Sequence, residues 1–163
     1  MKTLLCAILT CSFFITLAQS DNIETEINNQ VWLPFIKTYN NFDAIGFMNL
    51  HSRDLVRVPV DAKKIYTFEE YSINNQQSNE MSLRNKRKQA IEFSFEDRIH
   101  NETSAFETGY YKVTSSDNQG KTRTFYGKFT VVLRKFGDRW KIVLDSDTGK
   151  NITESNFLSG KKL

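Results

Sequence analysis

The chain has 163 residues, of which 39% are hydrophobic, and a formal net charge of +3 at pH 7. So small a positive excess argues against a protein that depends on nucleic acid or on an anionic membrane for binding. The only cysteines, Cys6 and Cys11, lie in one apolar stretch. The chain beyond that stretch has no thiol for a disulfide, for a Cys-ligated metal or for nucleophilic catalysis.

Residues 1–20 have the pattern of a secretory signal peptide. Lys2 supplies a positive start, an apolar stretch follows, and Ala18 and Ser20 are small residues at the positions that a signal peptidase reads. The apolar stretch is shorter than the roughly twenty residues of a membrane-spanning helix. We therefore expect export, to the periplasm or the exterior, and one domain over residues 21–163. A retained anchor and a lipid-modified Cys11 are the alternatives.

Two helices are predicted at the start of this domain. Residues 21–30 are polar and read as an irregular lead-in. From Val31 to Tyr39, apolar residues recur at spacings of three and four, which predicts an amphipathic helix that ends at Asn40. Asp43 is a typical N-cap for a second helix over residues 44–51.

A short strand and a polar helix follow. Residues 54–60 alternate and are β-branched, which predicts a short strand, and Pro59 either places this strand at an edge or ends it. Thr67 and Glu70 have the spacing of a capping box, which predicts a helix over residues 68–88. Its basic end, residues 84–88, lacks interleaved aromatic residues and indicates a solvated helix end rather than a nucleic-acid site.

The second half of the chain changes to a period of two. Strands are predicted over residues 91–99, 106–114, 122–136 and 139–147, with a tight turn at Gly137. Helices followed by an antiparallel meander indicate an α+β fold in a single domain, with its core at about residues 31–148. The many aromatic residues in these strands predict either a conical cavity between sheet and helices or a filled core.

Three segments resemble the nuclear transport factor 2-like superfamily, and within it the SnoaL-like proteins and the association domain of calmodulin-dependent kinase. They are YNNFD at residues 39–43, NLHSRDLVRV at 49–58, and the hairpin at 127–147 with its WKIV. The resemblance implies a cystatin-like cone, in which N-terminal helices pack on a curved, mostly antiparallel sheet. It also implies a homodimer through the sheet, but no particular activity. The expected pocket-lining residues are Trp32, Phe35, Tyr39, Phe93, Phe95, Phe129 and Trp140.

Asp97 is the best candidate for a catalytic residue. It falls on the alternation of Phe93 and Phe95, so it is expected to point into the cone, where burial would raise its pKa and make it a base. Tyr39 or His51 would be its partner. An ion pair with a neighbouring cation, or a position past a bulge on the rim, are the alternatives.

Asp145 and Asp147 are expected to face outward. Alternation from Trp140 places Leu144 and Ser146 on the inner face and both aspartates on the outer one. Their spacing to later residues does not fit a calcium loop. His51 and His100 lack the acidic neighbours of a zinc site, so we expect neither a metal nor another cofactor.

Two functions follow from these observations. The first is an exported, non-catalytic dimer whose aromatic cone holds a small apolar ligand. The second is an isomerase, dehydratase or hydrolase of the ketosteroid-isomerase type that uses Asp97. If the cone is filled, the sheet serves only for assembly.

Overall fold

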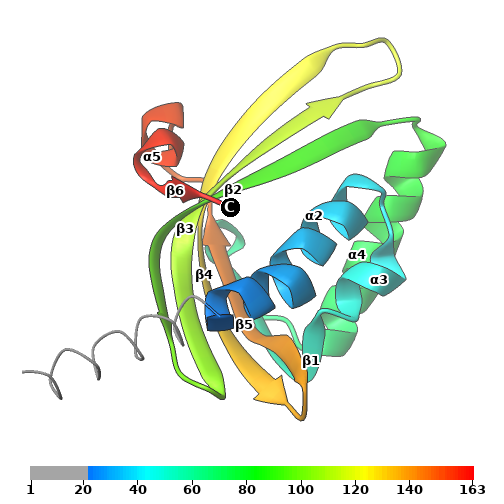
Figure 1. Ribbon diagram of the computed structural model, residues 1–163. Coiled ribbons are helices and arrows are strands. Elements are labelled where there is room, and N and C mark those ends of the chain that lie inside the picture. The colour runs from blue at the N-terminus through cyan, green and yellow to red at the C-terminus, as the bar shows by residue number, and fades with distance from the viewer. Residues whose placement is uncertain (1–21) are drawn as a thin grey trace, which may run out of the picture.

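A computed structural model describes residues 22–163, and the predicted signal peptide at residues 1–20 lies outside them. Helices lie against one face of a curved sheet, as predicted for an α+β fold of this class (Figure 1). The helices on the concave face are α2 (Leu33–Asn40), α3 (Ala44–Met48) and α4 (Phe68–Arg84), whereas α5 (Glu154–Ser159) lies on the opposite side.

The sheet consists of the strands β1 (His51–Pro59), β2 (Lys88–His100), β3 (Ser104–Ser116), β4 (Thr122–Phe136), β5 (Arg139–Thr148) and β6 (Lys161–Lys162). Their order in the sheet is β1-β5-β4-β3-β2-β6. The four strands from β2 to β5 pair in succession, each antiparallel to the next, as in the predicted meander, and β1 pairs with β5 in parallel as an edge strand. A short 3₁₀ helix, η2 (Val60–Ala62), follows Pro59.

The predicted irregular lead-in is wrong, because the chain is helical from residue 22 through η1 (Asn28–Trp32) into α2. Ile27 and Val31 are fully buried, so this polar segment carries an apolar stripe one turn earlier than expected. The segment η1 is a π-helical turn directly before Pro34. A π-helical turn is wider than an α-helical one, so it accommodates Pro34, which lacks an N–H and whose ring would clash with the preceding turn of a regular helix.

A buried charged network fastens this first helix to the sheet. The Trp32 indole N–H donates to Glu107 Oε2 at 2.6 Å, and Arg98 contacts Glu107 Oε1 at 2.7 Å. Arg98 also reaches Glu24 and Asn28. Burial raises the pKa of Glu107, which Arg98 and Trp32 partly offset. Because the carboxyl is fully buried, these donors are what make its burial tolerable.

Several predicted boundaries move by a few residues. α3 ends at Met48 and β1 begins at His51, so His51 is in a strand rather than at a helix end. α4 does begin at the Thr67 capping box, but it ends at Arg84. Lys86 adopts a left-handed turn, and Lys88 starts β2. No helix of residues 22–163 combines the length and the apolar character that crossing a membrane requires.

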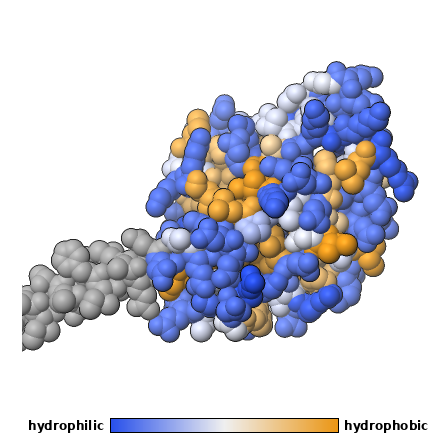
Figure 2. All heavy atoms as spheres, turned by 45° about the vertical axis from the view of Figure 1, so that its right-hand side comes forward, coloured by the Kyte–Doolittle hydropathy of each residue, from blue (hydrophilic) through white to orange (hydrophobic). Residues whose placement is uncertain are grey.

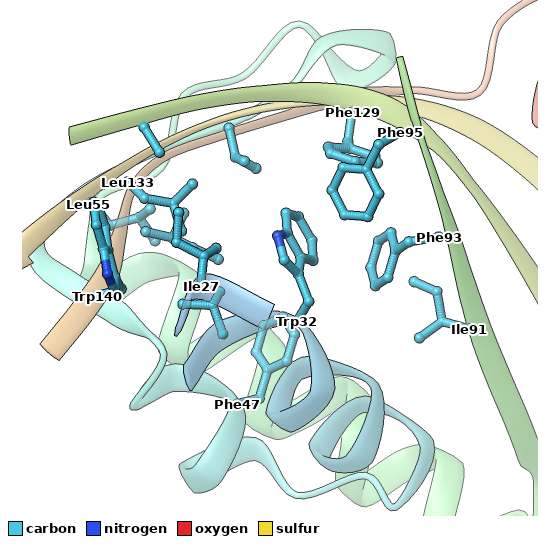
Figure 3. Close-up of a cluster of buried hydrophobic side chains, with 14 of the residues drawn as sticks. Ile27, Trp32, Phe47, Leu55, Ile91, Phe93, Phe95, Phe129, Leu133 and Trp140 are labelled. Atoms are coloured by element: carbon cyan, nitrogen blue, oxygen red, sulfur yellow. The ribbon is translucent and has the colours of Figure 1, made fainter. Parts of the chain in front are cut away.

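The core occupies much of the space between the concave face and the helices. At one end Trp140, Leu133 and Ile27 pack together, and at the other Trp32 points toward Phe93 and the neighbouring rings (Figure 3). The outer surface seen in Figure 2 is mostly hydrophilic, with apolar side chains in separate patches. The Trp32 end of the core matters for the site, because it borders a cavity lined mostly by aromatic side chains.

Candidate functional site

A cavity of about 180 Å³ opens between the concave face of the sheet and the helices. Side chains from all the concave-face helices and from β1 to β5 line it, and most of them are aromatic. The lining residues are Trp32, Phe35, Tyr39, Phe47, Arg57, Tyr71, Ile91, Phe93, Tyr111, Val113, Phe129, Val131, Asp145 and Asp147.

The aromatic wall is a continuous ring cluster around Trp32. Its ring centroid lies 4.7 Å from that of Phe93, 5.2 Å from Phe129 and 5.9 Å from Phe35. Phe47 stacks edge-on against Phe35 at 4.7 Å. Tilted and edge-to-face contacts at these distances are favourable and hold each ring in place, so the wall is preorganised.

Asp145 and Asp147 point into this cavity, so the expectation that they face outward is wrong. The register of β5 on β4 shifts between Ile142 and Leu144, which leaves Val143 as an extra residue without a partner. A β-bulge of one residue reverses the alternation that follows it. Trp140 and Ile142 face inward before the bulge, and both aspartates face inward after it.

Arg57 on β1 binds both aspartates. Its Nε lies 3.4 Å from Asp145 Oδ2, and its Nη2 contacts Asp147 Oδ1. It also donates to the Asp145 carbonyl oxygen at 3.3 Å, and its guanidinium lies 5.3 Å from the centre of the Tyr71 ring. Burial alone would lower the pKa of Arg57, but the charges of Asp145 and Asp147 raise it. Arg57 therefore stays charged.

Asp145 is buried yet ionised. Burial raises the pKa of this carboxyl, but Arg57 and His51 more than offset that effect, and the pKa is lowered overall. His51 Nε2 lies 3.9 Å from Asp145 Oδ2 and has no hydrogen-bond partner in the part of the chain that the structure describes, while His51 Nδ1 is 3.0 Å from the Phe47 carbonyl oxygen. Because a carbonyl oxygen only accepts, Nδ1 carries a proton.

Asp147 lies where the cavity meets a second, more open one of about 600 Å³. Both cavities are bordered by Asp147, Tyr39, Tyr111 and Val113. The Tyr111 hydroxyl donates to Asp147 Oδ2 at 2.8 Å. Burial and the charge of Asp147 raise the pKa of Tyr111 and of Tyr39, so both hydroxyls remain neutral. A ligand that moves from the open cavity into the inner one would therefore pass the Asp147 carboxylate.

Five of the residues expected to line the pocket border the cavity: Trp32, Phe35, Tyr39, Phe93 and Phe129. Phe95 and Trp140 are buried in the core and do not. Trp140 lies at the far end of the core, beside Leu55 (Figure 3). Phe95 packs edge-on against Trp32, one ring behind the wall.

The structure contradicts the inward position of Asp97. The register of β2 on β3 shifts between Phe95 and Asp97, so Glu96 is an extra residue. This bulge reverses the alternation, and Asp97 is exposed on the outer side, near the Thr108 hydroxyl at 3.5 Å. Neither Tyr39 nor His51 contacts it among the interactions of residues 22–163. Asp97 therefore lacks the apolar surroundings that would make it a base.

Sequence reasoning missed the polar residues of the site, namely Arg57, Tyr71, Tyr111, Asp145 and Asp147. One signal was available, because Arg57 is two residues after the apolar Leu55 and must share its inward face. Within the described part of the chain, no group of three or more His, Cys, Asp or Glu side chains is arranged to hold a metal ion.

The arrangement of sheet, helices and cavity has counterparts among solved structures. A nuclear transport factor 2-like superfamily protein from Salmonella enterica superposes with a TM-score of 0.65 at 14% identity, over 82% of this chain and 95% of that one. The chain has a nuclear transport factor 2-like fold. At this level of identity the likeness concerns the fold alone.

Other proteins with the nuclear transport factor 2-like fold are similar to a comparable degree. A protein from Xanthomonas campestris, described as a calcium/calmodulin dependent protein kinase II association domain, has a TM-score of 0.57 at 19% identity, over 73% of this chain and 82% of its own. A ketosteroid isomerase-like protein from Erwinia carotovora has a TM-score of 0.56 at 10% identity, over 74% and 91%. The chain matches no protein-family model and no curated protein sequence.

Proposed function

We propose that this protein binds a small, largely apolar ligand in the aromatic-walled cone. The observation that carries this proposal is a cavity of about 180 Å³ walled by preorganised rings, with a few convergent polar groups at one side. Ligand sites are typically concave and apolar with a small number of placed polar groups. At about 30 Å³ per water, the volume corresponds to roughly six waters, which suits a ligand of a few heavy atoms.

Catalysis through Asp97 is not part of the proposal, because Asp97 is exposed on the outer side of the sheet. The inward aspartates are poor general bases for a different reason. Asp145 is held ionised by Arg57, and Asp147 accepts from Arg57 and Tyr111. The Asp145 carboxylate, with its lowered pKa, therefore takes up a proton weakly near neutral pH, and the Asp147 carboxylate is already engaged by two donors.

Native mass spectrometry of the protein purified from its own host tests this proposal. The wild type is expected to retain a small molecule, and Val113→Phe is expected to lose it because a ring at this position would occupy the cavity. Val60→Phe is the matched control, since Val60 is exposed outside both cavities. Repeated recovery of empty wild-type protein, or retention by Val113→Phe, would overturn the proposal.

Intrinsic fluorescence gives an independent readout. Of the two tryptophans, Trp32 borders the cavity and Trp140 does not. In a Trp140→Phe background, Trp32 is the single indole reporter, and its emission is expected to shift when the cavity is filled. An unchanged emission with a ligand that native mass spectrometry shows to be bound would place that ligand elsewhere.

We also propose that the protein acts after export. The support is the signal-peptide pattern of residues 1–20. N-terminal sequencing of the protein from its host is expected to begin near Asp21. A chain that still starts at Met1 in a membrane or cytoplasmic fraction would contradict export.

A further inference from the structure

The charged groups around the two adjoining cavities are predominantly acidic. The chain as a whole has a net charge of +3. By contrast, the Arg, Lys, Asp and Glu side chains that border the inner cavity and its open neighbour are Arg57, Asp61, Asp145 and Asp147. One guanidinium faces three carboxylates, so the local sign of charge is opposite to that of the whole molecule.

Asp61 and Asp145 are held in their ionised form. Asp61 accepts from the Thr148 hydroxyl at 2.6 Å and from the Gly149 N–H at 2.7 Å, and these hydrogen bonds lower its pKa. Arg57 and His51 lower the pKa of Asp145 against the effect of burial. Arg57 is shared between Asp145 and Asp147, so it does not neutralise both. A negative excess therefore persists at neutral pH.

Like the negative excess, the aromatic rings around the cavity favour a positively charged ligand. The rings of Tyr39, Phe35 and Tyr111 line the inner cavity together with Asp147. Ring faces carry a negative quadrupole potential and attract cations, most strongly where water is excluded. An anion in this space would meet both the carboxylates and the ring faces. A neutral apolar molecule would satisfy the rings but leave the excess charge unpaired.

We propose that the ligand of the cone is a small organic cation, an ammonium group with apolar substituents whose charge lies beside Asp147 and against the ring faces. This inference rests on the proposed ligand-binding function and names the chemical class of the ligand. Asp147 is the contact residue because its side chain is 23% exposed and borders both cavities, whereas the Asp145 side chain is 12% exposed and borders the inner cavity but not the open one.

A pair of probes that differ in charge tests the inference. Choline and its uncharged carbon isostere, 3,3-dimethylbutan-1-ol, have the same shape, so a difference in affinity reports the charge alone. Titration of the Trp140→Phe protein, followed by Trp32 emission, is expected to give at least tenfold tighter binding of choline. Isothermal titration of the wild type is the independent check.

Two aspartate variants locate the effect. Asp147→Asn is expected to weaken choline about tenfold while leaving the isostere within twofold, since the amide keeps the volume and removes the charge. Asp97→Asn is the matched control, because Asp97 is an exposed aspartate outside both cavities, and it is expected to change neither affinity. Thermal unfolding of both variants checks that they fold.

The outcomes separate the two proposals. If the isostere binds as tightly as choline or more tightly, the ligand is not a cation, while the pocket retains its proposed role. If Asp147→Asn leaves choline binding unchanged, the charge contact is wrong. If neither probe binds and the host-purified protein is empty, both the ligand class and the binding function fail.

Discussion

Arg57 and Asp145 are register partners across the parallel pairing of β1 with β5, and their side chains meet on the inner face with Nε 3.4 Å from Oδ2. The same pair therefore joins the edge strand to the sheet and forms the charged side of the cavity. Since β1 is bound to the sheet only along β5, this contact links the stability of the edge strand to the state of the site.

Arg57→Met is expected to lower the free energy of unfolding by about 3–5 kcal/mol, because it leaves Asp145 buried without its counter-charge. Urea denaturation of wild type and variant measures the change. Arg84→Met is the matched control, as Arg84 pairs with Glu80 on the exposed face of α4 and should cost at most about 0.5 kcal/mol. Equal changes in the free energy of unfolding for the two variants would show that the buried ion pair stabilises the protein no more than the exposed one.

The lowered pKa of Asp145 predicts a dependence of stability on pH. A carboxyl with a depressed folded-state pKa stabilises the protein above its unfolded value, about 3.9, and loses this contribution as the pH falls through the folded value. Unfolding by urea between pH 7 and pH 2 should show this loss in the wild type. The loss should be smaller in Asp145→Asn, and identical slopes would contradict the assignment.

Trp32→Phe is expected to lower the free energy of unfolding by about 1.5–3 kcal/mol more than Trp140→Phe does. Both indoles are almost fully buried, but only Trp32 donates to a buried carboxylate, Glu107, at 2.6 Å. Among residues 22–163, no acceptor meets the Trp140 indole N–H with hydrogen-bond geometry. Hydrogen bonds to charged groups contribute more than neutral ones, so the difference isolates the Glu107 contact from the loss of ring volume. Equal losses of unfolding free energy for the two variants in chemical denaturation would show that the Glu107 hydrogen bond adds no stability.

Gly127→Ala should damage the site without touching a charged residue. Gly127 lies directly opposite Tyr111 on β3, and a Cβ there would collide with the Tyr111 ring. The ring would have to move away from Asp147, so we expect a loss of about 1–3 kcal/mol in stability and weaker choline binding. Gly149→Ala controls for the substitution itself, since its Cβ meets only ordinary contacts. Unaltered Tyr111 chemical shifts in NMR would refute this.

The outer face of the sheet carries an apolar row that supports the proposed homodimer. Registered neighbours form it on β1, β5, β4, β3 and β2: Val56, Leu144, Val132, Phe106 and Ile99. Ile99 is 64% exposed and Phe106 40%. Burial of such a row in a symmetric interface would remove apolar area from water.

Light scattering should accordingly give twice the chain mass for the wild type and a single chain for Phe106→Lys. Phe125→Lys, which alters an exposed phenylalanine outside the row, should leave the dimer intact. A monomeric wild type at micromolar concentration would contradict assembly through this face.

The sequence was informative where side-chain periodicity is uninterrupted. The helix face with Trp32, Phe35 and Tyr39, and the alternation of Phe93 with its neighbours, were both predicted and both border the cavity. The polar half of the site was not predicted. Asp97 was assigned inward and Asp145 and Asp147 outward, and each assignment is reversed by one unpaired residue, Glu96 or Val143.

Such bulges depend on how two strands pair over their whole length, so they have no local sequence signature. The lead-in at residues 22–30 was missed for a related reason. Its apolar positions, Ile23 and Ile27, are too few to reveal a helix before the packing partners on the sheet are known.

The extra residue Val143 also bears on how this pocket can change over generations. If a change in β4 let Val143 pair with Val132, the strand would shift by one residue, and Leu144 and Ser146 would replace the two aspartates on the inner face. A pocket suited to a charged ligand would then suit an uncharged apolar one, without a change in any aromatic lining residue. Loss of Val143 itself would keep both aspartates inside, because Leu144 would still follow Ile142 in the register. Relatives with equally aromatic pockets can therefore differ in what they bind, and the register of the strand after the tryptophan is the place to look.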